Sequence, residues 1–260
     1  MIQPMPLSAI RIVLVEPSHP GNIGAVARAM KNMALAELIL VRPKAYPHAE
    51  ATARASGADD LLARARVVGS VAEAVADCGF VAATTSRSRD HNFRALDLHE
   101  ATERIFAMSE RGPAAVLFGA ERTGLTNEEL ALAHLLIRIP ANPEYPSLNL
   151  AMAVQLVCYE LFRAAGTPAS SRPLVESDVP LAPGADMERF YAHLQEVLDE
   201  VDFRDRTQGG THLMTRIRRL FQRCEMDQNE VNILRGILTA VQSKRRPAGA
   251  PSKDTVAGKP

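Results

Sequence analysis

Short apolar runs alternate with segments of helical periodicity through the first two-thirds of the sequence. The runs are four to six residues long, β-branched and apolar on both faces, as expected for strands covered by helices on both sides of a parallel sheet. The predicted strands are Ile10–Val15, Leu38–Val41, Ala65–Val68, Phe80–Thr84, Ala114–Phe118 and Leu135–Ile139. Predicted helices include Asn22–Met33, Val71–Asp77 and Ser147–Arg163. The pattern therefore predicts an α/β domain with a parallel sheet.

The sequence changes character after residue 165. Residues 166–185 are rich in Pro, Ala and Ser without periodicity, which is typical of a linker. Residues 186–246 carry helical spacing, and residues 247–260 lack the apolar residues of a packed segment. The predicted helices are Asp186–Val201, with Asp186 as its cap, Leu213–Phe221 and Asn229–Val241. We expect an α/β domain over 1–165, a linker, a small α-helical C-terminal extension that packs on another surface, and a disordered tail.

Composition argues against several classes of protein. The chain is 47% hydrophobic and 23% charged, and no apolar run approaches the ~18 residues of a membrane span. Its first residues lack the pattern of a secretory signal, so we expect a cytoplasmic protein. Cys78, Cys158 and Cys224 lie far apart, which predicts buried free thiols and no disulfide framework. The seven histidines show no ligand spacing, so no metal is expected.

Charge is balanced overall but clustered locally. Lys plus Arg equals Asp plus Glu at 30 each, so any affinity for nucleic acid has to come from patches. Between Arg204 and Arg223 there are six arginines against one acid, and a second cluster holds Arg87, Arg89 and Arg94. For each cluster, a solvated helix face and a phosphate contact remain equally open at this point.

Two loops that follow predicted strands carry glycine. Ligands of parallel α/β sheets bind beyond the carboxyl ends of the strands, so these loops are where chemistry is expected. Glu16–Arg28 is a Pro/Gly-rich turn that enters a helix, and it lacks the GxGxxG of a dinucleotide site. An ordinary turn with a surface arginine is the competing interpretation. Phe118–Thr126 holds two glycines five residues apart, but Leu125 stands where a P-loop needs lysine, which argues against a nucleotide triphosphatase.

A third loop, Ile139–Leu150, contains three prolines and leads into a long helix. Prolines restrict the backbone, so this loop can hold its groups rigidly around a ligand. Ser147 is also a competent helix cap, and that structural role is the competing explanation for it.

The three loops together resemble a known enzyme class. The segments EPSHPGNIGAVARAMKNM, LFGAERTGLTNEEL and IRIPANPEYPSLNLAMAVQL resemble the signature motifs of the SPOUT RNA methyltransferases, most closely the TrmJ-type tRNA (cytidine/uridine-2′-O-)-methyltransferases. The likeness covers about residues 9–165, and ERFYAHL and NILRGIL extend it into the C-terminal region. It implies a sheet with a deep trefoil knot, S-adenosyl-L-methionine as cofactor, a homodimer, and 2′-O-methylation of tRNA, with cytidine or uridine 32 of the anticodon loop as the expected target.

The resemblance also implies roles for individual residues. Arg28 is placed at the reacting ribose, where a guanidinium that stays protonated stabilises charge and does not act as a base. Ser147 is expected to orient the 2′-hydroxyl or relay its proton, and Asn22 and Glu121 to fix the loops, Glu121 by pairing with Arg28. The implied cofactor residues are Thr84, Thr85, Ser86, Gly119, Glu121, Gly124, Ile139, Pro146, Ser147, Leu148 and Asn149. The implied substrate contacts are Asn22, Arg28, Arg87, Arg89, Arg216, Arg218 and Arg219.

Three alternatives remain at this stage. A methyltransferase of the same class acting on ribosomal RNA would carry the same motifs, although the C-terminal helical unit favours tRNA. A non-catalytic RNA-binding protein of the same fold is disfavoured by the presence of Arg28, Glu121 and Ser147. A nicotinamide-dependent oxidoreductase is disfavoured by the missing glycine motif.

Overall fold

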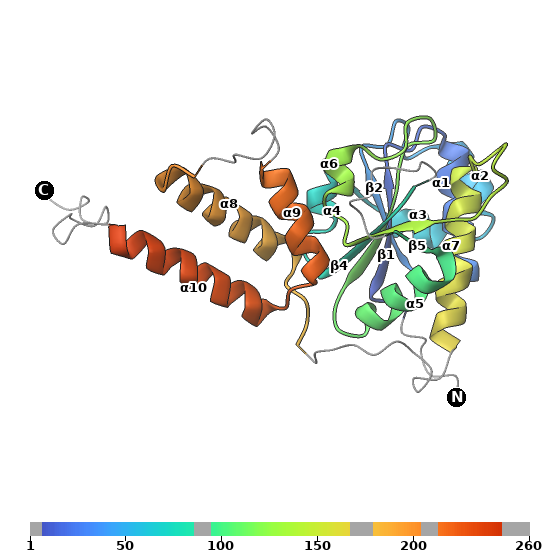
Figure 1. Ribbon diagram of the computed structural model, residues 1–260. Helices are drawn as coiled ribbons and strands as arrows, with labels where there is room; N and C mark the ends of the chain where they lie inside the picture. Colours follow the sequence, from blue (N-terminus) through green and yellow to red (C-terminus); the bar gives the residue numbers. More distant parts are fainter. Residues whose placement is uncertain (1–6, 86–94, 167–178, 204–212, 246–260) are drawn as a thin grey trace, which may run out of the picture.

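The computed structural model describes residues 7–85, 95–166, 179–203 and 213–245. In these residues an α/β domain lies beside a smaller unit of three helices (Figure 1). Ser86, Arg87 and Arg89, all predicted site residues, lie outside the described ranges, as does the predicted tail. The predicted α/β domain with a helical C-terminal extension is confirmed.

Seven strands form one parallel sheet in the order β3-β2-β1-β6-β4-β7-β5. They are β1 Ile10–Val15, β2 Glu37–Val41, β3 Arg66–Val68, β4 Phe80–Thr84, β5 Ala95–Asp97, β6 Ala114–Phe118 and β7 Leu135–Arg138. The six predicted strands are confirmed, with ends that shift by one residue in three of them. The edge strand β5 was not predicted, because its three residues are exposed or half-buried and carry no apolar run.

Helices cover both faces of the sheet. Along β1, Ile10, Ile12 and Leu14 join the larger buried cluster, whereas Val13 and Val15 join the cluster on the opposite face. The larger cluster is covered by α1 Pro20–Asn32, α2 Ala49–Ala55, α3 Asp59–Arg64, α5 Leu98–Ser109 and α7 Leu150–Gly166. The other face carries the short helices α4 Val71–Ala74 and α6 Asn127–Leu130.

A close contact between α1 and α2 fixes the first loop on the sheet. A Cβ added to Gly24 would lie 2.0 Å from the carbonyl oxygen of Ala51, so only glycine lets the two backbones approach this closely. Pro20 occupies the first turn of α1, where its missing N–H costs nothing. Pro20 therefore favours the start of α1, and Gly24 sets how closely α1 approaches α2.

The C-terminal unit consists of α8 Gly184–Glu200, α9 Leu213–Cys224 and α10 Gln228–Arg245. It has a core of its own, made of Met187, Phe190, Tyr191, Val197, Met226, Val231 and Leu238 with Ala182. The expectation of Asp186 as a cap is wrong, since α8 begins two residues earlier and Pro183 precedes it. Asp186 lies instead in the first turn, where a negative charge favours the helix.

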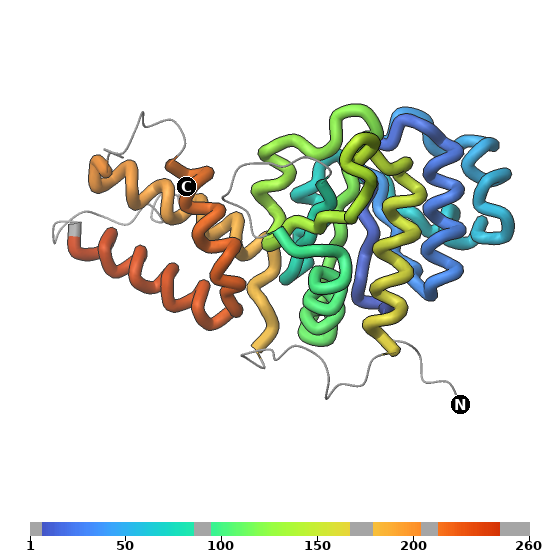
Figure 2. Tube along the Cα trace, turned by 45° about the vertical axis from the view of Figure 1, so that its right-hand side comes forward, coloured from blue at the N-terminus to red at the C-terminus, as the bar shows by residue number. Residues whose placement is uncertain are grey.

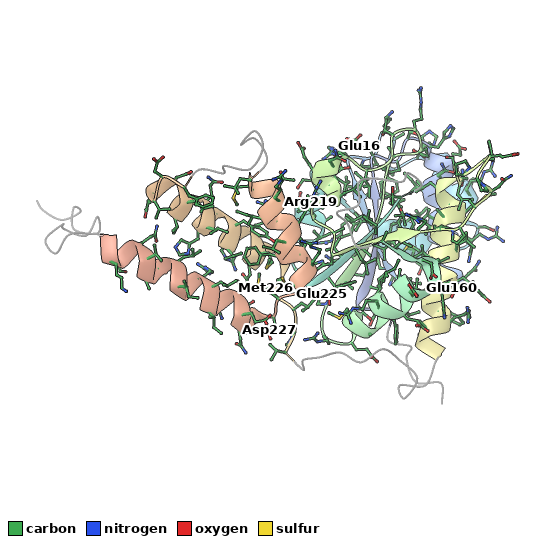
Figure 3. The ribbon with its side chains drawn as sticks, viewed as in Figure 1. Glu16, Glu160, Arg219, Glu225, Met226 and Asp227 are labelled. Carbon is green, nitrogen blue, oxygen red and sulfur yellow. The ribbon has the colours of Figure 1, made fainter. Side chains whose placement is uncertain are left out.

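This unit is docked on the sheet domain through backbone contacts. The backbone N–H of Gly184 donates to Cys78 (3.0 Å) and that of Ala185 to Ala76 (2.8 Å). An ion pair between Arg104 of α5 and Glu225 adds a side-chain contact. Figure 2 shows the same arrangement after rotation, and Figure 3 places Glu225 at the seam between the two parts.

Two of the three cysteines are buried as predicted, Cys78 and Cys158, but Cys224 is exposed at the end of α9. Burial raises the pKa of the Cys78 thiol to about 12, so it stays protonated. Within the ranges given above, no helix has the length and apolarity to cross a membrane. The same part of the chain contains no group of three or more His, Cys, Asp or Glu residues suited to a metal ion.

Candidate active site

A pocket of about 350 Å³ opens at the carboxyl edge of the sheet. This volume lies within the range of ~300–1,000 Å³ typical of small-molecule sites. In Figure 3, Glu16, which follows β1, marks this edge of the sheet. The lining residues come from the ends of β4, β6 and β7, the loop after β6 and the start of α7.

Most of the predicted cofactor residues meet in this pocket. Those that line it are Thr84, Thr85, Gly119, Glu121, Gly124, Ile139, Pro146, Ser147 and Leu148. Asn149 is absent from the lining and instead bonds to Asn22 behind it. The second and third motif loops therefore meet in the pocket, as the parallel sheet predicts, whereas no residue of the first loop, Glu16–Arg28, lines it.

The loop after β6 is shaped by its two glycines. A Cβ on Gly119 would lie 2.3 Å from the backbone nitrogen of Leu125, so a side chain cannot fit there. Gly124 has φ of +68°, a left-handed conformation that favours glycine. The N–H of Gly124 closes the turn by donating to the carbonyl of Ala120 (2.8 Å). The turn brings residues 118–125 against the pocket.

Glu121 ties this turn to the loop after β1. Its carboxylate accepts hydrogen bonds from the Ser18 N–H (3.0 Å) and hydroxyl (2.8 Å), the His19 N–H (3.3 Å) and the Asn22 amide (2.9 Å). Partial burial by itself would raise the pKa of Glu121, but the bonds from Asn22 and Ser18 outweigh it and hold the pKa at about 2. Glu121 is therefore an ionised structural brace at neutral pH.

Asn22 continues the connection to the third loop. Its Oδ1 accepts from the side-chain amide of Asn149 (3.1 Å) while its own amide donates to Glu121. Because the amide of Asn22 both donates and accepts, the chain Asn149, Asn22, Glu121 links all three motif loops. These three side chains hold the loops in position relative to one another. The sequence analysis predicted this role for Asn22 and Glu121 but not for Asn149.

Arg28 does not pair with Glu121, contrary to the sequence-based expectation. The bonding partners of Glu121 in the described chain are Ser18, His19 and Asn22. Arg28 lies further along α1, is exposed, and is not part of the pocket lining. Glu121 turns toward the start of α1, and the guanidinium of Arg28 faces solvent.

Ser147 lies in the pocket, but it does not cap α7. The helix begins at Leu150, and the side chain of Asn149 accepts from the N–H of Ala151 (2.9 Å), which is the capping interaction. The structural explanation for Ser147 therefore fails, and its hydroxyl is available to a ligand in the pocket.

The predicted substrate arginines of α9 are largely engaged within the protein. Arg218 binds both carboxylate oxygens of Glu188, and its guanidinium lies 4.4 Å above the ring of Tyr191. Arg216 and Arg219 also have interaction partners. Arg223, on the same helix, is exposed.

Several residues of the site were not identified from the sequence. Ser18 supplies two of the bonds to Glu121, and Arg122 and Thr123 line the pocket beside it. Ser18 precedes the helix that starts at Pro20, and a small polar residue near a helix start is the one local signal that marks it. Leu150 and Ala153 line the pocket from α7, where their apolar character resembles that of any core position.

Comparison with known proteins covers both parts of the chain. Residues 9–159 match the model of the SpoU rRNA Methylase family, and residues 185–251 match that of the tRNA methyltransferase TrmJ, C-terminal domain. The tRNA (cytidine/uridine-2′-O-)-methyltransferase TrmJ of Photorhabdus laumondii is 47% identical over 238 residues, which cover 91% of this chain and 98% of that protein.

Two further relatives agree with this match. The tRNA (cytidine/uridine/adenosine-2′-O-)-methyltransferase TrmJ of Pseudomonas aeruginosa is 44% identical over 248 residues, covering 92% of this chain and 96% of its own. The crystal structure of TrmJ from Z. mobilis superposes with a TM-score of 0.78 at 37% identity, over 89% of this chain and 98% of that one. The fold class and the family expected from the motifs are confirmed.

Proposed function

The chain belongs to the SpoU methylase family, and from this premise we propose that it transfers the methyl group of S-adenosylmethionine to a ribose 2′-hydroxyl of tRNA. The observation that carries the proposal is that the second and third motif loops line one pocket while Glu121 and Asn149 bond the first motif to them, in a chain that also matches the TrmJ C-terminal domain. Because tRNA is handled in the cytoplasm, we place the protein there as well.

The pocket suits S-adenosylmethionine. Its volume of about 350 Å³ accommodates a ligand of that size class, and the close turn at Gly119 leaves room that a side chain would fill. Backbone groups of the turn and of the proline-rich loop can bond an adenine ring and a methionine chain. Bound S-adenosylmethionine supplies an electrophilic methyl group on its sulfonium centre. Residues Thr84, Thr85, Gly119, Ile139 and Leu148 would hold it, with Ser86 and Asn149 assigned by the resemblance.

Ser147 is proposed to bind the 2′-hydroxyl. Its side chain lies in the pocket and is not used in capping α7. A hydroxyl can accept the proton of the ribose and donate its own, so Ser147 can align the 2′-oxygen with the cofactor and relay its proton. Alignment of the two reacting groups accounts for much of such a reaction rate.

Arg28 is proposed to stabilise negative charge at the reacting ribose. Its guanidinium remains protonated, so it can bind the flanking phosphate and stabilise the developing alkoxide, and it cannot serve as a base. Since Arg28 is exposed and lies outside the pocket lining, the ribose would reach it at the pocket mouth or in the pocket of a second copy.

We also propose that the protein is a homodimer built on α7. Met152, Leu156 and Tyr159 are spaced by four and three residues, so they share one helix face, and all three are exposed. Phe162 extends this apolar face along the helix. Because α7 packs against α1, which carries Arg28, a second copy on this face would bring Arg28 close to the subunit boundary.

The tRNA is proposed to contact both parts of the chain. Arg87 and Arg89 lie between β4 and β5 in the sequence, and Arg216, Arg218 and Arg219 of α9 are the proposed contacts from the C-terminal unit. Each of these arginines already has a partner within the protein, Glu188 in the case of Arg218, so each would exchange that interaction for a phosphate at a cost. Asn22 completes the substrate contacts near the pocket.

Methyl transfer from labelled S-adenosylmethionine, offered to bulk tRNA and to ribosomal RNA in parallel, tests this function. The proposal predicts label in tRNA. Label only in ribosomal RNA would keep the chemistry and change the substrate. No label in either RNA, with RNA binding retained, would support a non-catalytic RNA-binding protein instead.

A further inference from the structure

A second cavity, of about 180 Å³, lies between the sheet domain and the C-terminal unit. Its walls come from α4, the start of β4 and the turn before β7 on one side, and from α8 and α9 on the other. Figure 1 shows α8 and α9 beside α4 and β4 at this seam. Most of the lining is apolar, with residues such as Val75, Leu132 and Met187. None of it belongs to the pocket at the carboxyl edge.

Gln222 of α9 brings an unpartnered acceptor to this cavity. Its side chain is only 8% exposed. The amide nitrogen donates to the carbonyl of Leu132 (3.3 Å), and because only the NH₂ group can donate, the position of the amide oxygen is fixed as well. That oxygen, Oε1, is buried and has no hydrogen-bond partner in the described chain. A buried acceptor of this kind is unfavourable unless a ligand or solvent donates to it.

His134 brings a donor to the same cavity. Its Nδ1 accepts from the N–H of Val81 (3.1 Å), so Nδ1 carries no proton. Burial holds the pKa of His134 at about 4, and the neutral ring must then carry its proton on Nε2. The ring stacks on Phe80 at 5.1 Å, which fixes its plane. Within the described residues, this Nε2–H has no acceptor.

We propose that this cavity binds a nucleobase. The Nε2–H of His134 donates to a ring acceptor, and Oε1 of Gln222 accepts from the adjacent donor, which is the paired edge that nucleobases present. An apolar cavity of about 150 Å³ holds benzene, so the volume here suits one substituted ring. The one carboxylate of the lining, Glu188, is paired with Arg218, so the site favours a neutral ligand.

Two sources can supply such a ring: a base turned out of bound tRNA, or a free nucleobase. The tRNA source rests on the proposed function, whereas the free base does not. In either case the ligand touches both the sheet domain and α9, so it stabilises the docked position of the C-terminal unit. β4 connects this cavity, at Val81, with the cofactor pocket, at Thr84.

Two measurements on the full chain test the proposal and distinguish the sources. In the first, cytosine, uracil and adenine are titrated with S-adenosylhomocysteine filling the cofactor pocket, and binding is followed by ligand-observed NMR. In the second, KM values for tRNA and for S-adenosylmethionine are measured separately. The variants are Gln222→Met, which removes the acceptor at similar size, and Ala72→Trp, which adds bulk at an exposed lining position of α4.

Gln195→Met is the matched control, because Gln195 is a half-buried glutamine of α8 that bonds Asp199 and does not line the cavity. A free base as ligand predicts that both variants, but not the control, weaken probe binding about three- to tenfold. A base of tRNA as ligand predicts a KM for tRNA raised by the same factor with KM for S-adenosylmethionine unchanged. If neither variant changes probe affinity or KM for tRNA, the site is overturned. If only the proposed function is wrong, the unaltered chain will transfer no methyl group, but the binding of the nucleobases measured by NMR will be unaffected.

Discussion

Glu121 shows how one side chain can set the geometry of a pocket without reacting itself. It accepts four hydrogen bonds from Ser18, His19 and Asn22, and Asn22 passes the connection on to Asn149. The donors lie in the loop after β1 and the first turn of α1, whereas Glu121 is on the loop after β6. Loss of its negative charge should therefore loosen the connection between these two segments.

Glu121→Gln tests this role through stability. The amide keeps one acceptor but places an NH₂ group against donors, so we expect a loss of about 1–3 kcal/mol in the free energy of unfolding, measured in urea. The pKa of Glu121 is about 2 when folded, below the ordinary value of about 4.3. The stabilising effect is thus complete above about pH 5 and is lost as pH falls toward 2. If the free energies of unfolding of the unaltered protein and of Glu121→Gln differed by the same amount from pH 6 to pH 2.5, this assignment would be contradicted.

Arg28→Ala and Ser147→Ala test the two groups proposed to act on the ribose. Removal of a charge-stabilising cation typically lowers kcat by about 10²-fold, and we expect that loss for Arg28→Ala. For Ser147→Ala a loss of at least about tenfold is expected, since an aligning hydrogen bond is removed. Affinity for S-adenosylmethionine, measured by calorimetry, should stay close to that of the unaltered protein for Arg28→Ala.

Arg66→Gln serves as control, because Arg66 is exposed at the start of the edge strand β3, away from the pocket. Unchanged turnover in both Arg28→Ala and Ser147→Ala would remove these two residues from the mechanism.

At the scale of elements, the glycine turn after β6 determines whether the cofactor pocket forms. Gly119→Ala would place a methyl group 2.3 Å from backbone atoms of Gly124 and Leu125, so the turn must open. We expect affinity for S-adenosylmethionine to fall at least about tenfold, measured by calorimetry. Gly112→Ala is the control, since a Cβ there meets nothing within 4 Å. Equal affinity of the two variants would show that the turn does not shape the site.

The elements that the sequence predicted are those whose pattern reflects burial. β1, β4 and β6 were predicted with their observed ends because each is buried over most of its length and is apolar apart from Arg11 in β1 and Thr84 at the end of β4. β5 was missed because an exposed edge strand has no such pattern. The loops of the site could be placed on one edge of the sheet from strand direction alone.

Side-chain partners within the site were harder to predict. The predicted pairing of Glu121 with Arg28 is wrong. The sequence places both residues near the site, but it does not give the distance between α1, which carries Arg28, and the turn after β6, which carries Glu121. Ser147 was considered as a cap, but the chain stays irregular up to Asn149, which fills that role. Such partners depend on distances between segments about a hundred residues apart, which no local pattern encodes.

For the molecule as a whole, we propose a dimer formed through α7. Leu156→Glu would place a charge on the exposed apolar face of that helix, and in a symmetric dimer the two charges would lie close together. We expect sedimentation to show a monomer, and methyl transfer to decrease with it. Val67→Glu is the control, since Val67 is also an exposed apolar residue but lies on β3 at the sheet edge. A dimer that persists in Leu156→Glu would move the interface elsewhere.

The measurement that most directly tests the central claim is the position of the methyl group on an unmodified tRNA. The purified protein is incubated with the transcript and labelled S-adenosylmethionine, and the product is digested with nucleases and mapped by mass spectrometry. We expect one 2′-O-methylated pyrimidine, at position 32 of the anticodon loop. A methyl group on a base, or no transfer to any tRNA, would contradict it.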